Sequence, residues 1–250
     1  MRTVERFHVE VSALLTRIVA EEQQTIARAA AVLADVVARD RLIYVFGTGG
    51  HSYIGAEEMF YRAGGLACVC PVFDPGLSLS FGGRRSTAIE RLPGYAPRAL
   101  AGYPISSQDA LVIVNAYGIN AATIDAALWA RERGVPTVGV TSPAFSRATP
   151  PDHPARHPSR QNLCDLVDHV IDTKMPPGDA VLVFDDLQPP VGPTSTILNA
   201  FALQSVAAAT VETLLGRGVL PPVWMSGNVP GGDEANRHLF ERYAPRVRWL

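Results

Sequence analysis

Lysine is almost missing from this sequence: Lys174 is the only lysine among 22 lysine and arginine residues. A phosphate-binding loop of the Walker type ends in Gly-Lys followed by Ser or Thr, and the sequence has no such ending. An enzyme that forms a Schiff base would have to use Lys174, which lies in a proline-rich segment. The shortage of lysine therefore excludes the first kind of site and makes the second unexpected.

Cysteine is scarce as well, with Cys68, Cys70 and Cys164 as the only three. Three cysteines cannot form a disulfide framework. Cys68 and Cys70 flank Val69 in an expected strand, so we expect buried thiols there. No further ligands follow at a spacing that would complete a metal site, so we expect neither a metal nor an organic cofactor.

The sequence also lacks long runs of one character. No basic run occurs and the net charge is −2, so we expect no nucleic-acid partner. No apolar stretch reaches the roughly 18–20 residues that span a bilayer, so we expect no membrane contact. The charged, amphipathic start (Arg2, Glu5, Arg6) is not a secretory signal, which makes the cytoplasm the expected location.

What is present is the composition of a well-packed globular protein, with 47% hydrophobic and 18% charged residues over 250 positions. Short apolar strands alternate with helices, which predicts a parallel sheet covered on both faces. The expected strands are 42–46, 67–72, 110–115, 137–141 and 167–171. The expected helices are two in 1–40 with a break at Gln23 and Gln24, then 53–62, 86–92, 121–133, 160–166, 194–215 and a last one in 223–250. We expect one domain over 1–250, divided into a helical segment (1–40), an α/β core (41–216) and a tail (217–250).

Two glycine-containing turns are the candidate ligand site. The first, residues 47–52, joins an apolar strand to a helix and contains Gly49, Gly50, His51 and Ser52. Backbone N–H groups and a hydroxyl at such a helix start favour an anion. The spacing departs from the dinucleotide-binding pattern, and Asp74 is too distant for its acidic residue, so a nicotinamide enzyme is a minor alternative.

The second turn follows the next expected strand and contains Asn115, Tyr117, Gly118 and Asn120. Turns after neighbouring parallel strands face one crevice, where these side chains would bind a polyol or an anion. Ordinary turn chemistry is the alternative, with Gly118 supplying a positive φ and Asn120 capping the helix.

With these segments in view, the chain resembles the sugar isomerase (SIS) domain family. The matching pieces are 47–52 with its helix, 115–120 with the helix 121–133, and 134–142. An uncharacterised, phosphosugar-binding-like subgroup is similar in addition at 56–65, 157–159, 177–180 and 226–229. The resemblance implies a flavodoxin-like three-layer sandwich with a five-stranded parallel sheet and added terminal helices. It also implies a sugar-phosphate site at the two turns and a homodimer or homotetramer.

The second turn departs from the family pattern. Many SIS domains have Ser-x-Ser-Gly there, and this chain has Asn-Ala-Tyr-Gly at 115–118. An amide and a phenol fill more space and offer a different geometry than two hydroxyls. The ligand can therefore be a sugar with another anionic group, or an unphosphorylated sugar.

Isomerisation of a sugar through an enediol needs a base and groups that stabilise an oxyanion. The resemblance to heptose-phosphate isomerases implies Glu58 as the base, with Glu57 beside it as the alternative. The further candidates are Glu90 as a second base, His51 as an anion-binding or polarising group, His157 reaching over the crevice from a neighbouring subunit, and Ser195 and Asn199 at the start of the long helix. Each of them has a structural alternative, as an ion-paired, capping or loop-stabilising residue.

The sequence therefore favours a metal-independent aldose–ketose isomerase that acts on a phosphorylated or otherwise anionic sugar. A binding or regulatory module without turnover is the alternative of another class. A lyase or etherase is a third possibility, because it starts with the same proton abstraction. The acids and histidines at the crevice favour catalysis, since a sensor needs no general base.

Overall fold

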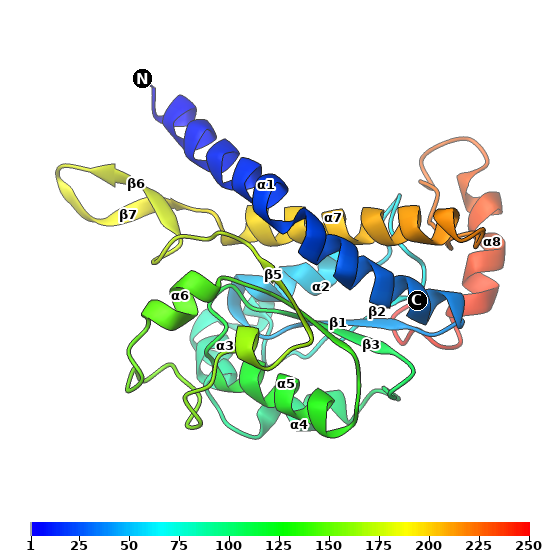
Figure 1. The fold of residues 1–250 in the computed structure, drawn as a ribbon, viewed down its shortest axis with the longest axis horizontal. Coiled ribbons are helices and arrows are strands. Elements are labelled where there is room, and N and C mark those ends of the chain that lie inside the picture. Colours follow the sequence, from blue (N-terminus) through cyan, green and yellow to red (C-terminus); the bar gives the residue numbers. More distant parts are fainter. Residues whose placement is uncertain (1) are drawn as a thin grey trace.

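The computed structural model describes residues 2–250 and contains a five-stranded parallel sheet with the order β2-β1-β3-β4-β5 (Figure 1). The strands are β1 (Ile43–Gly47), β2 (Val69–Pro71), β3 (Ala110–Val114), β4 (Thr137–Thr141) and β5 (His169–Asp172). This is the flavodoxin-like order, so the expected architecture is confirmed. Every residue of β1, β3 and β4 is buried, which explains why these strands read as continuous apolar runs.

Helices cover both faces of the sheet and complete three layers (Figure 1). One face carries α1 (Thr3–Ala38), α2 (Ile54–Met59) and α7 (Ser195–Gly216), and the other carries α3 (Gly83–Glu90), α4 (Tyr95–Leu100) and α5 (Ala121–Glu132). The neighbouring strands β1 and β3 thus lead into helices on opposite faces. The crevice between two such strands is where open α/β sheets bind ligands.

Residues 3–38 form one helix, and the expected break at Gln23 and Gln24 is wrong. α1 runs without interruption for 36 residues. Residues 3–38 contain neither proline nor glycine, and glutamine is a good helix former, so nothing in the segment ends the helix. Its buried side chains, among them Ile18, Ile26 and Leu33, pack against α7 and the sheet.

α7 corrects the expectation that no apolar stretch is long enough to span a bilayer. By length and composition alone the 22-residue helix passes that test. However, nearly half of the stretch is buried inside the protein, where α7 packs against α1 and α2. Core helices of α/β proteins have the same character, so the match is weak support for a membrane span.

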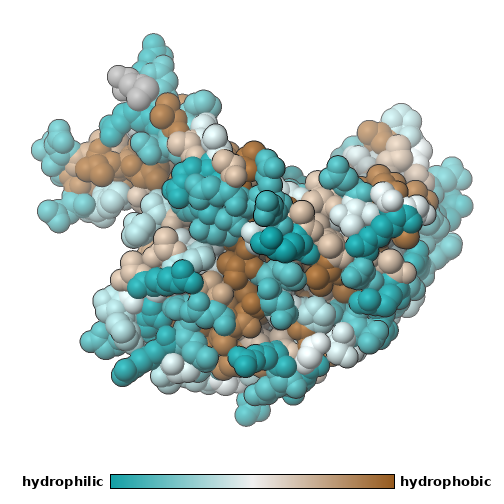
Figure 2. Space-filling view, viewed as in Figure 1, coloured by the Kyte–Doolittle hydropathy of each residue, from teal (hydrophilic) through white to brown (hydrophobic). Residues whose placement is uncertain are grey.

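A hairpin that the sequence analysis missed projects from the body next to the start of α1 (Figure 1). It consists of β6 (Ala180–Phe184) and β7 (Leu187–Pro193), which are antiparallel. The Arg6 guanidinium donates to the Val183 carbonyl at 2.9 Å and lies 5.4 Å from the Phe184 ring centroid. We call the hairpin and the first turns of α1, residues 3–10 and 180–193, the arm. Figure 2 shows hydrophobic side chains gathered over the hairpin.

Several other boundaries differ from expectation. The structure adds the short helices η1 (Gly50–Tyr53), η2 (Leu79–Phe81), α4 and α6 (Pro143–Ala148), and the last helix is α8 (Gly232–Tyr243). α2 ends at Met59, before the expected 62. The helix expected at 160–166 is only the single turn η3 (Leu163–Asp165), because Arg160 has a φ of 62° and the Leu163 N–H donates to the Gly118 carbonyl at 2.8 Å and not to the preceding turn.

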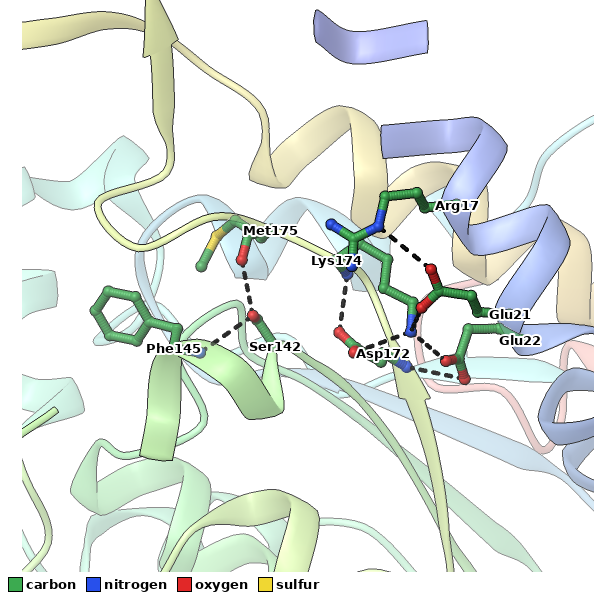
Figure 3. Close-up of polar contacts among 8 residues, drawn as sticks. All are labelled: Arg17, Glu21, Glu22, Ser142, Phe145, Asp172, Lys174 and Met175. Atoms are coloured by element: carbon green, nitrogen blue, oxygen red, sulfur yellow. Dashed lines mark hydrogen bonds and ion pairs between the residues drawn. The ribbon is translucent and has the colours of Figure 1, made fainter. Parts of the chain in front are cut away.

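The single lysine fastens α1 to the end of β5 (Figure 3). The Lys174 ammonium lies 2.6 Å from a Glu22 oxygen, 3.0 Å from Glu21 and 3.1 Å from Asp172. Burial alone would lower the pKa of Lys174, but hydrogen bonds to Glu22, Glu21 and Asp172 outweigh burial and raise it. The amine therefore stays protonated, which agrees with the expectation that it forms no Schiff base.

Candidate functional site

The two turns lie side by side at the carboxyl edge of the sheet, as expected. The Thr48 N–H donates to the Val114 carbonyl at 3.1 Å, and the Ala116 N–H donates to Ser52 Oγ at 3.1 Å. The Thr48 and Thr123 hydroxyl oxygens are 2.6 Å apart. The turns after β1 and β3 thus form one hydrogen-bonded unit.

The first turn passes directly against the end of α3. Gly49 has a φ of 121°, and a Cβ atom there would lie 2.5 Å from Glu90 Oε2. Only glycine fits both that backbone conformation and that contact. The Gly50 N–H donates to Ser86 Oγ, one turn earlier in α3, at 3.2 Å. α3 therefore covers the turn and places Glu90 on it.

Glu90 is the most perturbed carboxyl group of the site. Burial raises its pKa to about 7, and the nearby Arg91 offsets only part of this effect. No hydrogen bond joins its carboxylate to any of residues 2–250. A carboxyl group with a pKa near 7 can both take up and release a proton at neutral pH.

Tyr117 in the second turn completes a group of three acidic side chains. Burial raises the pKa of its phenol, and the charges of Asp179 and Glu90 raise it further. Its ring packs on Phe145 of α6 with a centroid distance of 4.6 Å, and 37% of the residue is exposed. The charges of α3 and of the loop before β6 therefore reach the second turn.

Asn115 and Ser52 hold the turns in place and do not face the crevice as free ligands. Asn115 Oδ1 accepts hydrogen bonds from the N–H groups of Tyr117 at 3.1 Å and Gly118 at 2.7 Å. Its Nδ2 donates to Thr48 Oγ1 at 3.1 Å, and the residue is buried. Gly118 has the expected positive φ, 65°.

Asn120 precedes α5 but its side chain does not cap the helix, contrary to that alternative. Nδ2 donates to the Ala155 carbonyl at 3.1 Å, and the buried Oδ1 has no partner among residues 2–250. The unpartnered buried oxygens of the described chain gather at the same edge of the sheet. They are Asn120 Oδ1, Thr141 Oγ1 at the end of β4, Thr173 Oγ1 after β5 and Asn199 Oδ1 in α7.

A narrow pocket between α2 and α7 brings Glu58, His51 and Asn199 together, with Thr196 beside them. Glu58 Oε2 accepts from Arg62 at 2.9 Å, and Oε1 accepts from the Gln204 amide at 3.1 Å. Glu57 is exposed, so only one of the two acids points inward, as expected. Glu58 thus lines the pocket with both oxygens already bonded.

Two expected residues lie elsewhere. His157 Nε2 is 3.2 Å from an Asp125 oxygen and Nδ1 is 2.8 Å from Ser159 Oγ, so both ring nitrogens are occupied on the α5 side. Within this chain His157 therefore fastens its loop to α5, and the expectation that it reaches over the crevice of a neighbouring subunit stays a prediction. The Ser195 hydroxyl is bound too, because it donates to Asp179 Oδ2 at 2.8 Å.

The sequence analysis missed Asp179. Its Oδ1 accepts from the N–H groups of Thr194 at 2.8 Å and Ser195 at 2.6 Å, so the carboxylate covers the start of α7. It lies in the segment 177–180 that resembles the family subgroup, and this is the signal that could have drawn attention to it.

A larger open depression lies at the opposite edge, where β4 and β5 begin. It is lined by residues that include Arg131, Thr137, Asp168 and His169. Asp168 is engaged there by the Thr137 N–H and hydroxyl, at 2.8 and 2.7 Å. In doubly wound sheets ligands bind beyond the carboxyl ends of the strands, so the turns and not this depression are the candidate site.

Comparison with known proteins identifies the family of this chain. The sequence profile of the SIS domain matches residues 6–142. A UPF0309 protein of Geobacillus thermodenitrificans is 36% identical over 244 residues, which cover 98% of this chain and 96% of that protein. A UPF0309 protein of Streptomyces coelicolor is 38% identical over 240 residues, which cover 94% of this chain and 92% of that protein.

Solved structures show the same fold at low sequence identity. A phosphoheptose isomerase from Francisella tularensis superposes with a TM-score of 0.54 at 10% identity, over 85% of this chain and all of that one. The corresponding enzyme from Neisseria gonorrhoeae gives 0.53 at 14% identity, over 84% and 96%. The Vibrio vulnificus NanR protein in complex with ManNAc-6P gives 0.51 at 16% identity, over 98% of this chain and 69% of that one. The profile spans more than half of the sequence and the relatives span nearly all of it, so this chain belongs to the SIS domain family, among its UPF0309 proteins.

Proposed function

We propose that this protein is an aldose–ketose isomerase that works through an enediol and needs no metal. The observation that carries the proposal is Glu90, a half-buried carboxyl group without a hydrogen-bond partner in residues 2–250, lying against Gly49 at the crevice. Isomerisation moves a proton between adjacent carbons, so one group must accept it and return it. A pKa of about 7 suits both steps near neutral pH.

The neighbouring groups suit the other requirements of this reaction. The enediol carries developing negative charge on oxygen, which a positioned donor stabilises. The Tyr117 phenol is such a donor, because its raised pKa keeps it protonated. His51 of the first turn is exposed and supplies a polar group for the hydroxyls of an open-chain sugar.

Glu58 remains the base implied by the family resemblance. It lines the pocket, but its two oxygens accept hydrogen bonds from Arg62 and Gln204. We therefore propose Glu90 as the proton-transfer group and Glu58 as the residue that fixes α2 against α7.

A binding module without turnover is the competing function, and the fold allows it, because the SIS neighbours include both phosphoheptose isomerases and NanR. A protein that only binds a sugar does not need a carboxyl group such as Glu90, with a pKa of about 7, near the protonated Tyr117 phenol. A lyase or etherase would use Glu90 for the same proton abstraction. Its activity differs from isomerisation because the product has lost a group from the sugar.

Deuterium exchange tests the proposal. The protein is incubated in deuterated water with sugars and sugar phosphates, the latter first because the neighbours named above act on or bind them. We expect deuterium at C1 or C2, and a drop in exchange of about 10²–10⁴-fold for Glu90→Gln. Glu57→Gln, a matched change at an exposed acid of α2, should leave exchange unchanged.

Two results would count against it. Full exchange by Glu90→Gln together with loss in Glu58→Gln would transfer the role to Glu58. Binding of a sugar by the parent protein without any exchange or turnover would favour the binding module.

A further inference from the structure

The backbone donors that could hold a phosphate at the second turn are already used inside the protein. The N–H groups of Tyr117 and Gly118 both point to Asn115 Oδ1. The N–H of Ala116 donates to Ser52 Oγ. A phosphate would have to replace the Asn115 amide and break the bonds that join the two turns.

The start of α7 is closed in the same way. A 22-residue helix offers its first N–H groups and its dipole to an anion. Here the Asp179 carboxylate takes the N–H groups of Thr194 and Ser195 and the Ser195 hydroxyl. The protein thus supplies its own anion at this position, and a second one would be repelled.

The unpartnered side-chain atoms at this edge are acceptors, which adds no donor for a phosphate. Asn120 Oδ1, at the start of α5, and Asn199 Oδ1, in the pocket with His51, are buried and have no partner in residues 2–250. The Glu90 carboxyl lies against Gly49, where an anion on the first turn would meet it. No lysine or arginine lines the pocket of His51 and Asn199. The cation bound to its lining residue Glu58 is Arg62, and that ion pair already uses its charge.

We infer that the substrate is an unphosphorylated sugar, because the protein's own side chains occupy the N–H groups of the second turn and of the start of α7. The inference rests on the proposed function and narrows its substrate class, against the anionic sugar expected from the sequence. The exposed Tyr117 ring, packed on Phe145, offers the apolar face that a neutral sugar ring or chain can cover.

Calorimetric titration with matched pairs tests the substrate class. The pairs are fructose and fructose 6-phosphate, glucose and glucose 6-phosphate, and xylulose and xylulose 5-phosphate. We expect the free sugar of a pair to bind about tenfold or more tightly than its phosphate, because the phosphate meets like charge. Equal or tighter binding of a phosphate, or no binding of any free sugar, overturns the inference.

The same pairs separate this inference from the proposed function. Deuterium exchange with a sugar phosphate but not with its free partner leaves the isomerase and removes the inference. Tighter binding of the free sugar without deuterium exchange supports the inference on the substrate class and contradicts the proposed isomerase activity.

A variant tests the closed anion site without knowledge of the sugar. Asn115→Ser has a shorter side chain that cannot reach both N–H groups, so we expect it to gain binding of millimolar inorganic phosphate that the parent lacks. Asn115→Asp keeps the acceptor and should gain nothing. Asp179→Ala opens the start of α7 and should gain phosphate binding independently. Phosphate binding by the parent, or no gain in either folded opening variant, contradicts the inference.

Discussion

Replacing Lys174 by methionine removes the one cation that holds α1 to β5. The Lys174 side chain is 7% exposed and that of Glu22 10%, so the variant leaves a buried carboxylate without its partner. Loss of one partner of a buried ion pair costs about 3–5 kcal/mol. Glu21 is 48% exposed and is rehydrated, which favours the lower end, about 3 kcal/mol.

The assay is urea unfolding followed by circular dichroism, with a thermal melt beside it. For a chain of this size, about 3 kcal/mol corresponds to a fall in Tm of about 6–12 °C. Because the folded pKa of Lys174 lies above that of an unfolded lysine, its contribution is complete at neutral pH and is lost only as the pH rises through the folded value. The deficit of Lys174→Met should therefore be the same at pH 7 and pH 9.

Two further variants make the reasoning refutable. Lys174→Met combined with Glu22→Gln should regain part of the lost stability, because it removes the uncompensated charge. Arg17→Gln breaks only the exposed pair with Glu21 and should cost less than about 0.5 kcal/mol. A Lys174→Met protein as stable as the parent, or a double variant less stable than the single one, would refute the account.

Three more predictions follow from the site and the arm. Burial raises the pKa of Glu90 from 4.5 to about 7, so its ionisation destabilises the fold as the pH rises from about 4.5 to 7. Glu90→Gln should therefore be more stable than the parent by up to about 3 kcal/mol at pH 8, and no more stable at pH 4.5. An equal free energy of unfolding for variant and parent in urea at both pH values would contradict this. Gly49→Ala should lose about 1–3 kcal/mol through its backbone conformation and its contact with Glu90, whereas Gly83→Ala, in an open position of α3, should not destabilise the protein in the same melts. The homodimer or homotetramer implied by the family remains a prediction. If the arm forms the contact between subunits, replacing its exposed Val183 and Val191 by Asp should lower the mass measured by light scattering. An unchanged mass would place the contact elsewhere.

The core of the fold is predictable because its signals are local. The runs at 110–114 and 137–141 are apolar and β-branched, and each is followed by turn residues and a helix. β7 could not be predicted, because Pro189, Pro190 and Pro193 read as a loop, yet an isolated two-stranded hairpin tolerates them.

The candidate site was predictable as a place but less so as a set of roles. Gly49 and Gly118 indicate the two turns in the sequence, and both have a positive φ in the structure. Sequence spacing does not say that Glu90 would lie on Gly49, that Asn115 would turn back to its own turn, or that Asp179 would cover the start of α7. These depend on contacts between segments far apart in the chain.

The uninterrupted helix α1 is about 54 Å long at 1.5 Å per residue. One end carries the hairpin through Arg6, and the middle is clamped to β5 through Lys174, beside the carboxyl edge of the sheet. The hairpin itself is joined by the chain to β5 and α7, and only Arg6 of α1 donates a hydrogen bond to it among residues 2–250. A one-residue insertion between Arg6 and Glu22 would rotate Arg6 by about 100° around the helix axis and separate α1 from the hairpin.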